Sequence, residues 1–141
     1  MTPKEYLSQS YRLEQIIKVT KLEIDTLKSM MYNVSSPSLE ERTGSSYSRD
    51  ASFVRTLYKL DEMTKKKDKQ LELLLKLRDQ IQSVISQIND KDCMLVLTYR
   101  YLHNWGWSRI ANELYADERT VRRWHDKGLS KIVLPNDVIT I

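Results

Sequence analysis

The sequence contains few residues that interrupt helices or cross-link chains. Its 141 residues include three glycines and three prolines, the residue types that most often mark turns and end regular elements. Together with 40% hydrophobic and 30% charged residues, this scarcity predicts a helix-rich soluble protein. A single cysteine, Cys93, excludes an internal disulfide and is typical of the reducing cytoplasm.

Long hydrophobic runs are also missing. No apolar run approaches the roughly 18 residues that a membrane-spanning helix needs. The first ten residues, MTPKEYLSQS, lack the apolar core of a signal peptide. We therefore expect a cytoplasmic protein that does not enter a membrane. The net charge of +4 is compatible with nucleic-acid binding but does not require it.

The residue patterns of enzymes and metal sites are absent from the sequence. It has no Ser/His/Asp set, no paired carboxylates in the context of a pocket and no glycine-rich phosphate loop. His103, His125 and Cys93 lack the close paired spacing of metal ligands. The sequence therefore predicts a protein that is not an enzyme and that has no cofactor and no metal.

What the sequence does contain is helical periodicity. Apolar residues recur at steps of three and four in two segments, 4–32 and 52–88, and predict two long amphipathic helices. Ile17 and Ile24 lie one heptad apart, as in a coiled coil. The predicted seam, for an oligomer or a partner, comprises Leu13, Ile17, Ile24, Leu27, Leu57, Leu60, Leu71, Leu74, Ile81 and Ile85.

A serine-rich stretch at about residues 33–51 separates these two helices. It contains Pro37 and Gly44 and few large apolar side chains, so it buries too little surface to fix one conformation. We interpret residues 1–89 as a helical hairpin with a flexible connector. Because a two-helix hairpin has a thin core, its seam packs within the chain, against a second copy, or both.

Residues 90–134 differ in character and predict a small three-helix domain. All three tryptophans of the chain lie in this region, and we predict that they belong to its core. Pro135 ends the region, and the tail, residues 135–141, is expected to form a short extended arm or to be disordered.

The last predicted helix, about 118–132, combines an apolar side with a basic one. Arginine at the start of such a helix can bind guanine through two hydrogen bonds or clamp a phosphate, and an acid can accept from cytosine. We predict that this helix enters the major groove of double-stranded DNA. The predicted DNA-binding residues are Arg109, Glu118, Arg119, Thr120, Arg122, Arg123 and Lys127.

The preceding helix carries a small residue where two helices of a helix-turn-helix cross. Ala111 occupies that position, because a larger side chain would push the helices apart. Val121 follows further along with an apolar β-branched side chain that suits the inner side of the last helix. The predicted helix-turn-helix core comprises Ile110, Ala111, Leu114, Val121, Trp124 and Ile132. On the inner side of the last helix, His125 is the alternative to Trp124, and Gly128 also faces inward.

Residues 92–132 resemble region 4 of sigma-70-type factors. They are also similar to phage transcription regulators of Gram-positive bacteria that carry such a domain, including ArpU-type and other late-gene regulators. The similarity rests on LTYRYL, WSRIANEL and RTVRRWHDKGLSKI. It implies a helix-turn-helix whose DNA-facing residues are Arg119, Thr120, Arg122 and Arg123.

Three positions depart from the pattern of these families. Tyr115 stands at the turn where glycine is usual, so a left-handed backbone there would be strained, unless the turn is built differently. Asp117 replaces the usual serine as N-cap, and Glu118 places an acid at the DNA-facing start. The N-terminal helices do not resemble the sigma regions that grip core polymerase, which favours a dedicated regulator over a complete sigma factor.

The leading hypothesis is a sequence-specific DNA-binding transcription regulator of phage or prophage origin. Its N-terminal helices would position the DNA-binding domain, either by forming a homo-oligomer, with a dimer favoured, or by docking on host RNA polymerase or another phage protein. Two alternatives stay open. One is a protein-interaction adaptor whose long helices bind a partner, and the other is a DNA-packaging recognition subunit.

Overall fold

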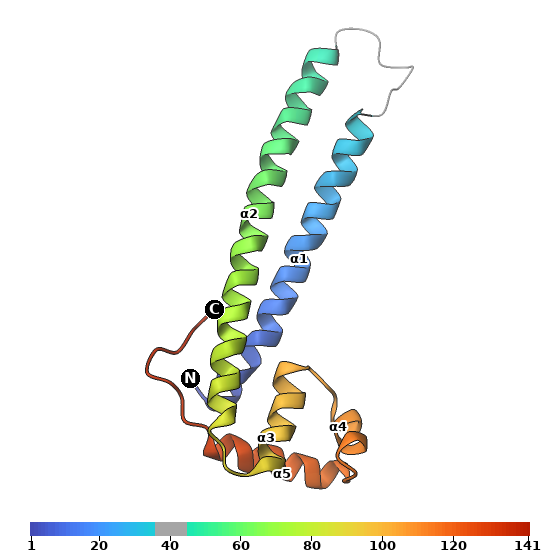
Figure 1. Cartoon of the computed structure of the whole chain (residues 1–141). Helices are drawn as coiled ribbons and strands as arrows, with labels where there is room; N and C mark the ends of the chain where they lie inside the picture. The colour runs from blue at the N-terminus through green and yellow to red at the C-terminus, as the bar shows by residue number, and fades with distance from the viewer. Residues whose placement is uncertain (36–44) are drawn as a thin grey trace. The chain divides into compact units, whose positions relative to one another are not determined.

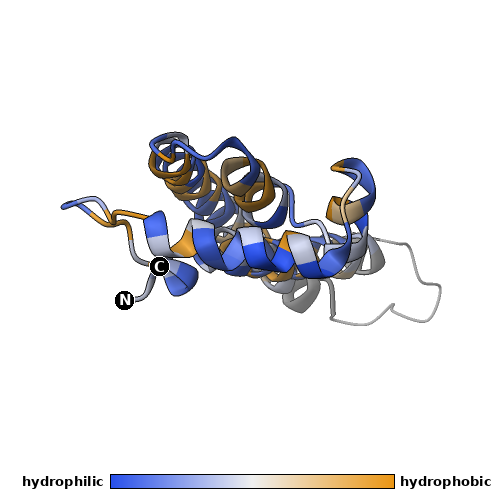
Figure 2. Cartoon of the chain, turned by 90° about the horizontal axis from the view of Figure 1, so that it is seen from below, coloured by the Kyte–Doolittle hydropathy of each residue, from blue (hydrophilic) through white to orange (hydrophobic). Residues whose placement is uncertain are grey.

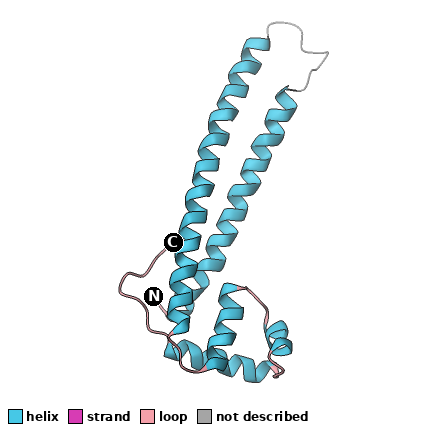
Figure 3. Ribbon diagram, viewed as in Figure 1, coloured by secondary structure: helices cyan, strands magenta, loops and turns pink. Residues whose placement is uncertain are grey.

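The computed structural model describes the backbone of residues 1–35 and 45–141 and the side chains of residues 1–32 and 51–141. Regular structure in this part of the chain is entirely helical (Figure 1, Figure 3), which confirms the predicted all-α class. None of these helices has both the length and the apolar character that crossing a membrane requires. The elements are α1 (Pro3–Ser35), α2 (Ser45–Ser86), α3 (Lys91–Leu97), the π-helical turn η1 (Thr98–Leu102), α4 (Trp107–Glu113) and α5 (Glu118–Lys131).

The two long helices extend beyond their predicted ends. α1 continues to Ser35 and α2 begins at Ser45, so the predicted connector over residues 33–51 was wrong on both sides. Extending an existing helix costs far less than nucleating a new one, and neither added segment contains glycine or proline. The middle of the predicted connector, residues 36–44, lies outside the described part of the chain.

The chain forms two compact units, and both long helices contribute to each. Unit 1 contains Met1–Glu14 and Leu73–Ile141, and unit 2 contains Gln15–Glu72. Unit 1 therefore combines the first turns of α1 and the last turns of α2 with the C-terminal helices. The sequence-based boundary near residue 90, which separates the long helices from the C-terminal helices, therefore does not divide the two units.

In unit 2, the two helical segments lie side by side and antiparallel (Figure 1). Their shared core is small, with Thr20, Ile24 and Met63 buried. The Thr20 hydroxyl donates to the carbonyl of Ile16 at 3.2 Å, which satisfies this polar group inside the core. Met63 was not among the predicted seam residues.

Burial along the predicted seam is uneven. Leu57 and Leu71 are each 41% exposed, so neither contributes to a core within the described chain. The buried members are Leu13, Ile24, Ile81 and Ile85, and the half-buried ones are Ile17, Leu27, Leu60 and Leu74.

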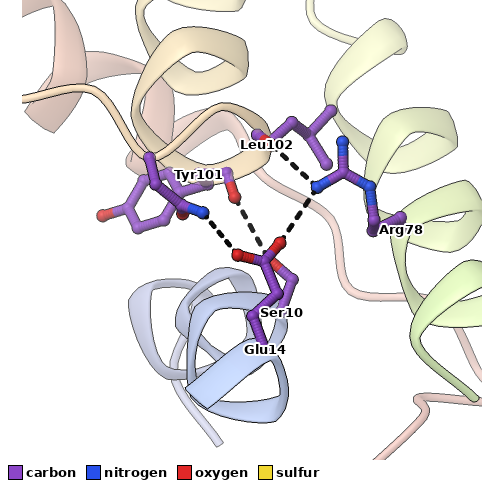
Figure 4. Close-up of polar contacts among 6 residues, drawn as sticks. Ser10, Glu14, Arg78, Tyr101 and Leu102 are labelled. Carbon is purple, nitrogen blue, oxygen red and sulfur yellow. Dashed lines mark hydrogen bonds and ion pairs between the residues drawn. The ribbon is translucent and has the colours of Figure 1, made fainter. Parts of the chain in front are cut away.

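In unit 1, the start of α1 packs against the end of α2 and against η1. Arg78 interrupts the apolar stripe of α2, and Figure 4 shows the polar contacts that explain its position. Its Nη1 donates to the carbonyl of Leu102 at 2.7 Å and to the carboxylate of Glu14 at 3.3 Å. Beside it, the Ser10 hydroxyl donates to the carbonyl of Tyr101 at 3.0 Å. These bonds satisfy carbonyls that the end of η1 leaves without helical partners.

The C-terminal tail is the extended arm of the two predicted alternatives. The side-chain amide of Gln9 donates to the carbonyl of Ile139 at 2.8 Å and accepts from the amide of Ile141 at 3.0 Å. Gln80 accepts from the amide of Ile139 at 3.1 Å. Two glutamines, one from α1 and one from α2, thus hold the tail against these helices within unit 1.

Candidate nucleic-acid interface

α5 crosses α3 and α4 through small residues. In α4, Ala111 is 5% exposed and belongs to a buried cluster with Ile110 and Val121. In α5, a Cβ atom at Gly128 would lie 2.9 Å from Cδ1 of Leu97 in α3. The close approach at both crossings buries the apolar side of α5 and leaves its opposite side exposed.

The predicted core residues of this region are buried or half-buried. Leu114 and Trp124 are half-buried and pack against the cluster, whereas Ile110, Ala111, Val121 and Ile132 are buried. His125, the predicted alternative to Trp124 on the inner side of α5, is 5% exposed. The turn of α5 directs His125 rather than Trp124 toward Tyr101 of η1.

The exposed side of α5 is basic at its N-terminal end. Figure 2 shows α5 as mostly hydrophilic along its length. The Asp117 carboxylate caps the helix by accepting from the amide of Thr120 at 2.9 Å. Hydrogen bonds from the Thr120 side chain and amide lower the pKa of Asp117, so the cap is charged at neutral pH. The exposed predicted DNA-binding residues of α5 are Glu118, Arg119, Arg122, Arg123 and Lys127.

Two of the predicted DNA-binding side chains have partners within unit 1. Thr120 is half-buried, and its side chain hydrogen-bonds the N-cap Asp117. Lys127 Nζ lies 3.2 Å from the carboxylate of Asp90, which is the N-cap of α3. The Lys127 side chain remains 55% exposed. Thr120 therefore takes part in the N-terminal cap of α5, and Lys127 forms an ion pair between α5 and the N-cap of α3.

Trp105 is half-buried and packs against the buried cluster that contains Ile110 and Ala111. One face of its ring stacks on Tyr99, with ring centroids 4.4 Å apart. The guanidinium of Arg109 lies 3.9 Å from the centre of the same ring. Cation–π contacts of this kind contribute about 0.5–1 kcal/mol at exposed sites. Arg109, a predicted DNA-binding residue at the surface of α4, is thus positioned by its contact with the Trp105 ring.

Trp107 is also half-buried and has two guanidinium groups close to its ring. Arg100 of η1 lies 4.3 Å and Arg122 of α5 lies 5.1 Å from the ring centre. Arg100 also donates to the carbonyl of Trp105 at 3.1 Å. Arg100 was not among the predicted DNA-binding residues, because the segment around it, LTYRYL, has the apolar spacing of a buried helix. The π-helical turn that places it beside Arg122 has no evident sequence signal.

A hydrogen-bonded chain runs beside Trp107. His125 Nε2 lies 2.6 Å from the Tyr101 hydroxyl, and Nδ1 lies 3.1 Å from the carboxylate of Asp126. Burial lowers the pKa of His125, although its hydrogen bond to Asp126 acts in the opposite direction. The ring is therefore neutral at pH 7, with Nδ1–H donating to Asp126 and Nε2 accepting from Tyr101.

The turn between α4 and α5 has the left-handed conformation anticipated for a glycine. Tyr115 has φ 52°. Its amide donates to the carbonyl of Asn112 at 3.4 Å, and the amide of Ala116 donates to the carbonyl of Ala111 at 3.1 Å. These two bonds form a Schellman motif. Of the two alternatives for this turn, the structure therefore adopts the strained backbone.

A protein-family model described as "Protein of unknown function (DUF722)" matches residues 5–133. The chain belongs to the DUF722 family. No curated protein and no solved structure matches it. The match includes the long helices α1 and α2 as well as α5, so both compact units of the chain belong to what defines DUF722.

Proposed function

We propose that this DUF722 protein is a sequence-specific DNA-binding transcription regulator of phage or prophage origin that acts in the cytoplasm. The observation that carries the proposal is the two-sided character of α5. Val121 and Gly128 are buried on one side, whereas Arg119, Arg122 and Arg123 are exposed on the other. Such a helix docks on its own domain by its apolar side and presents long basic side chains to the major groove.

We assign different roles to the arginines around α5. Arg119 and Arg123 are exposed near its N-terminus, where recognition helices contact base edges. Arg109 and Arg122 lie against tryptophan rings and are assigned to phosphates, which fix the register on the duplex. These charges together give most of the affinity and a steep dependence on salt.

Replacing Arg119 and Arg123 by alanine tests this assignment. The double variant should lose sequence-specific retardation of a DNA fragment selected by the intact protein, because each base contact contributes about 1–3 kcal/mol. Its circular dichroism should stay helical.

The matched control replaces Arg12 and Arg55, which are exposed on the long helices, and removes the same charge. It should retain the sequence preference. Unchanged specific binding by the Arg119/Arg123 variant contradicts the assignment, and so does an equal loss in the control.

We further propose that unit 2 joins two copies of the chain. Val19 and Leu22 are 54% and 65% exposed, and with Leu27 and Met63 they line a groove with a volume of about 350 Å³. Burying these apolar side chains against a second copy would stabilise a dimer by roughly 25 cal/mol for each Å² of apolar surface removed from water. A dimer would bring two recognition helices to the half-sites of one operator.

A protein-interaction adaptor is the second candidate function. The exposed apolar side chains of unit 2 favour it as much as they favour self-association. Selection of genomic fragments separates the two functions, because an adaptor would return no preferred sequence while forming a stable complex with one other protein.

A further inference from the structure

Unit 1 contains a cleft that brings basic side chains from three separate elements together. Its volume is about 350 Å³, and it lies among the first turns of α1, η1, the start of α4 and the middle of α5. Lys4 comes from α1, Arg100 from η1 and Arg122 from α5, while Trp107 forms part of the wall. The Ser8 hydroxyl also lines the cleft but donates to the carbonyl of Lys4 at 2.7 Å.

The two arginines of this cleft are fixed by their surroundings. Arg100 packs against the ring of Trp107 at 4.3 Å and uses Nη1 to donate to the carbonyl of Trp105. Arg122 lies 5.1 Å from the same ring. A guanidinium that packs its face on a ring keeps N–H groups at its edge for an acceptor. Because the arginines are already positioned, binding an acceptor costs less side-chain entropy.

The electrostatic character of the cleft is positive. Asp126 is its one acidic side chain among the described residues that line it, and that side chain is 79% exposed and 3.1 Å from His125 Nδ1. Burial is the main cause of the lowered His125 pKa, and the nearby positive charges of Arg100 and Lys4 lower it further. The cleft thus combines Lys4 and two positioned arginines with one solvated carboxylate, which favours an anion with several acceptor oxygens.

We propose that this cleft binds a phosphate group through Lys4, Arg100 and Arg122, and that the phosphate belongs to the DNA backbone. A phosphate offers oxygens in several directions, which suits donors that come from three elements. Assigning this phosphate to the DNA backbone rests on the proposed function, because only a DNA-binding protein would bring a duplex to the cleft. Such a contact would extend the DNA footprint from α5 to the first turn of α1. A free phosphate or a nucleotide has the same chemistry.

Inorganic phosphate is the first probe, added to the full chain at constant ionic strength with chloride as the balancing anion. The ring resonances of His125 should shift in a saturable way, whereas those of His103, which is exposed outside the cleft, should not. Lys4→Ala should weaken this binding roughly tenfold, as expected for one charged hydrogen bond. Arg12→Ala, which removes an exposed charge from the same helix, should leave it unchanged. A wild-type chain without a saturable shift, or an unaffected Lys4→Ala variant, overturns the site.

Salt dependence of duplex binding identifies the source of the phosphate. If the backbone supplies it, Lys4→Ala lowers the slope of log K against log salt by about 0.9, the value for one phosphate contact, and Arg12→Ala does not. An unchanged slope with an intact phosphate titration overturns the backbone source in favour of a free ligand. Arg119 and Arg123 lie outside the cleft. If the Arg119/Arg123 variant keeps its sequence preference, the proposed function is overturned. The phosphate titration tests the cleft independently of that result.

Discussion

Tyr115 has a backbone conformation that a tyrosine disfavours. In the left-handed region a Cβ atom crowds the following carbonyl, at a cost of roughly 1–2 kcal/mol for residues other than glycine. The side chain is 98% exposed, so no packing offsets that cost. The Schellman bonds of the turn between α4 and α5 hold the residue in place.

The first prediction is that Tyr115→Gly stabilises the protein. The free energy of unfolding should rise by about 0.5–1 kcal/mol, because relief of the left-handed strain exceeds the extra entropy of glycine in the unfolded chain. Denaturant unfolding followed by circular dichroism measures the change. Tyr115→Ala removes the same ring but keeps the strain, so a glycine variant no more stable than the alanine variant contradicts the account.

His125 makes stability depend on pH. A histidine in an unfolded chain has a pKa of about 6.5, and burial lowers the pKa of His125 in the folded protein. As the pH falls below 6.5, the unfolded chain therefore binds more protons than the folded one. The contribution of the neutral His125 ring to the free energy of unfolding is complete above pH 6.5 and is lost as the pH falls through the pKa of His125 in the folded protein.

The second prediction follows from this sign. Between pH 7.5 and 5.5, the denaturant midpoint of the wild-type chain should fall, and His125→Gln, which keeps an acceptor for Tyr101, should reduce that fall. His103→Gln should not reduce it, since His103 is exposed. A wild-type chain that is equally stable or more stable at pH 5.5 would contradict the neutral ring inferred from the structure.

Sequence reasoning at the residue scale located the turn and the basic side of α5, but not the surroundings of the tryptophans. A heptad or a small-residue pattern reports which side of a helix is apolar. It does not report that Arg109 will cover Trp105 or that Arg100 and Arg122 will meet at Trp107. These contacts depend on the π-helical turn and on the crossing of elements.

Small residues at the crossings determine how α5 packs. Gly128 lies so close to α3 that a Cβ atom would be 3.2 Å from Cβ of Cys93 and 2.9 Å from Cδ1 of Leu97. Both neighbours are fully buried, so neither can move away without disturbing the core. Ala111 is the small residue at the crossing with α4, and Gly128, which the spacing predicts to face inward, is the small residue at the crossing with α3.

The third prediction concerns this crossing. Gly128→Val should lower the free energy of unfolding by about 1–3 kcal/mol through overpacking. Ser130→Val introduces the same side chain at an exposed position of α5 and should change stability by less than about 0.5 kcal/mol. Thermal unfolding of the two variants compares them directly, and equal midpoints would contradict the tight crossing.

Helical periodicity was sufficient to predict the long helices but not their ends. The serines next to the connector favour neither helix nor irregular backbone strongly. The helices therefore continue through residues 33–35 and 45–51 at little cost in free energy. The exposure of Leu57 and Leu71 has a related cause. A stripe with steps of three and four drifts around a long helix, and only part of it can face a single neighbour.

At the scale of the whole molecule, unit 1 is held by contacts between distant parts of the sequence. Gln9 and Gln80 bind the tail, and Glu14 pairs with Arg78. Each of these residues is polar and lies in an otherwise ordinary helix, so the sequence gives no sign of its partner. This explains why the domain boundary predicted near residue 90 does not coincide with the limits of the compact units.

The fourth prediction concerns assembly through unit 2. Wild-type protein should have the mass of a dimer in sedimentation or light scattering at micromolar concentration. Leu22→Glu should shift the equilibrium toward monomers, because it places a charge on the apolar surface. Lys21→Glu, at an exposed neighbouring position, should shift it much less. A wild-type monomer at all concentrations would contradict the proposed dimer.

The decisive experiment for the role of α5 is selection of genomic DNA fragments by the purified full chain. We expect a shared sequence motif to be enriched, and the enrichment to be lost in the Arg119/Arg123 alanine variant. Recovery of fragments without any common sequence from the wild-type protein would contradict the assignment of α5 as a recognition helix.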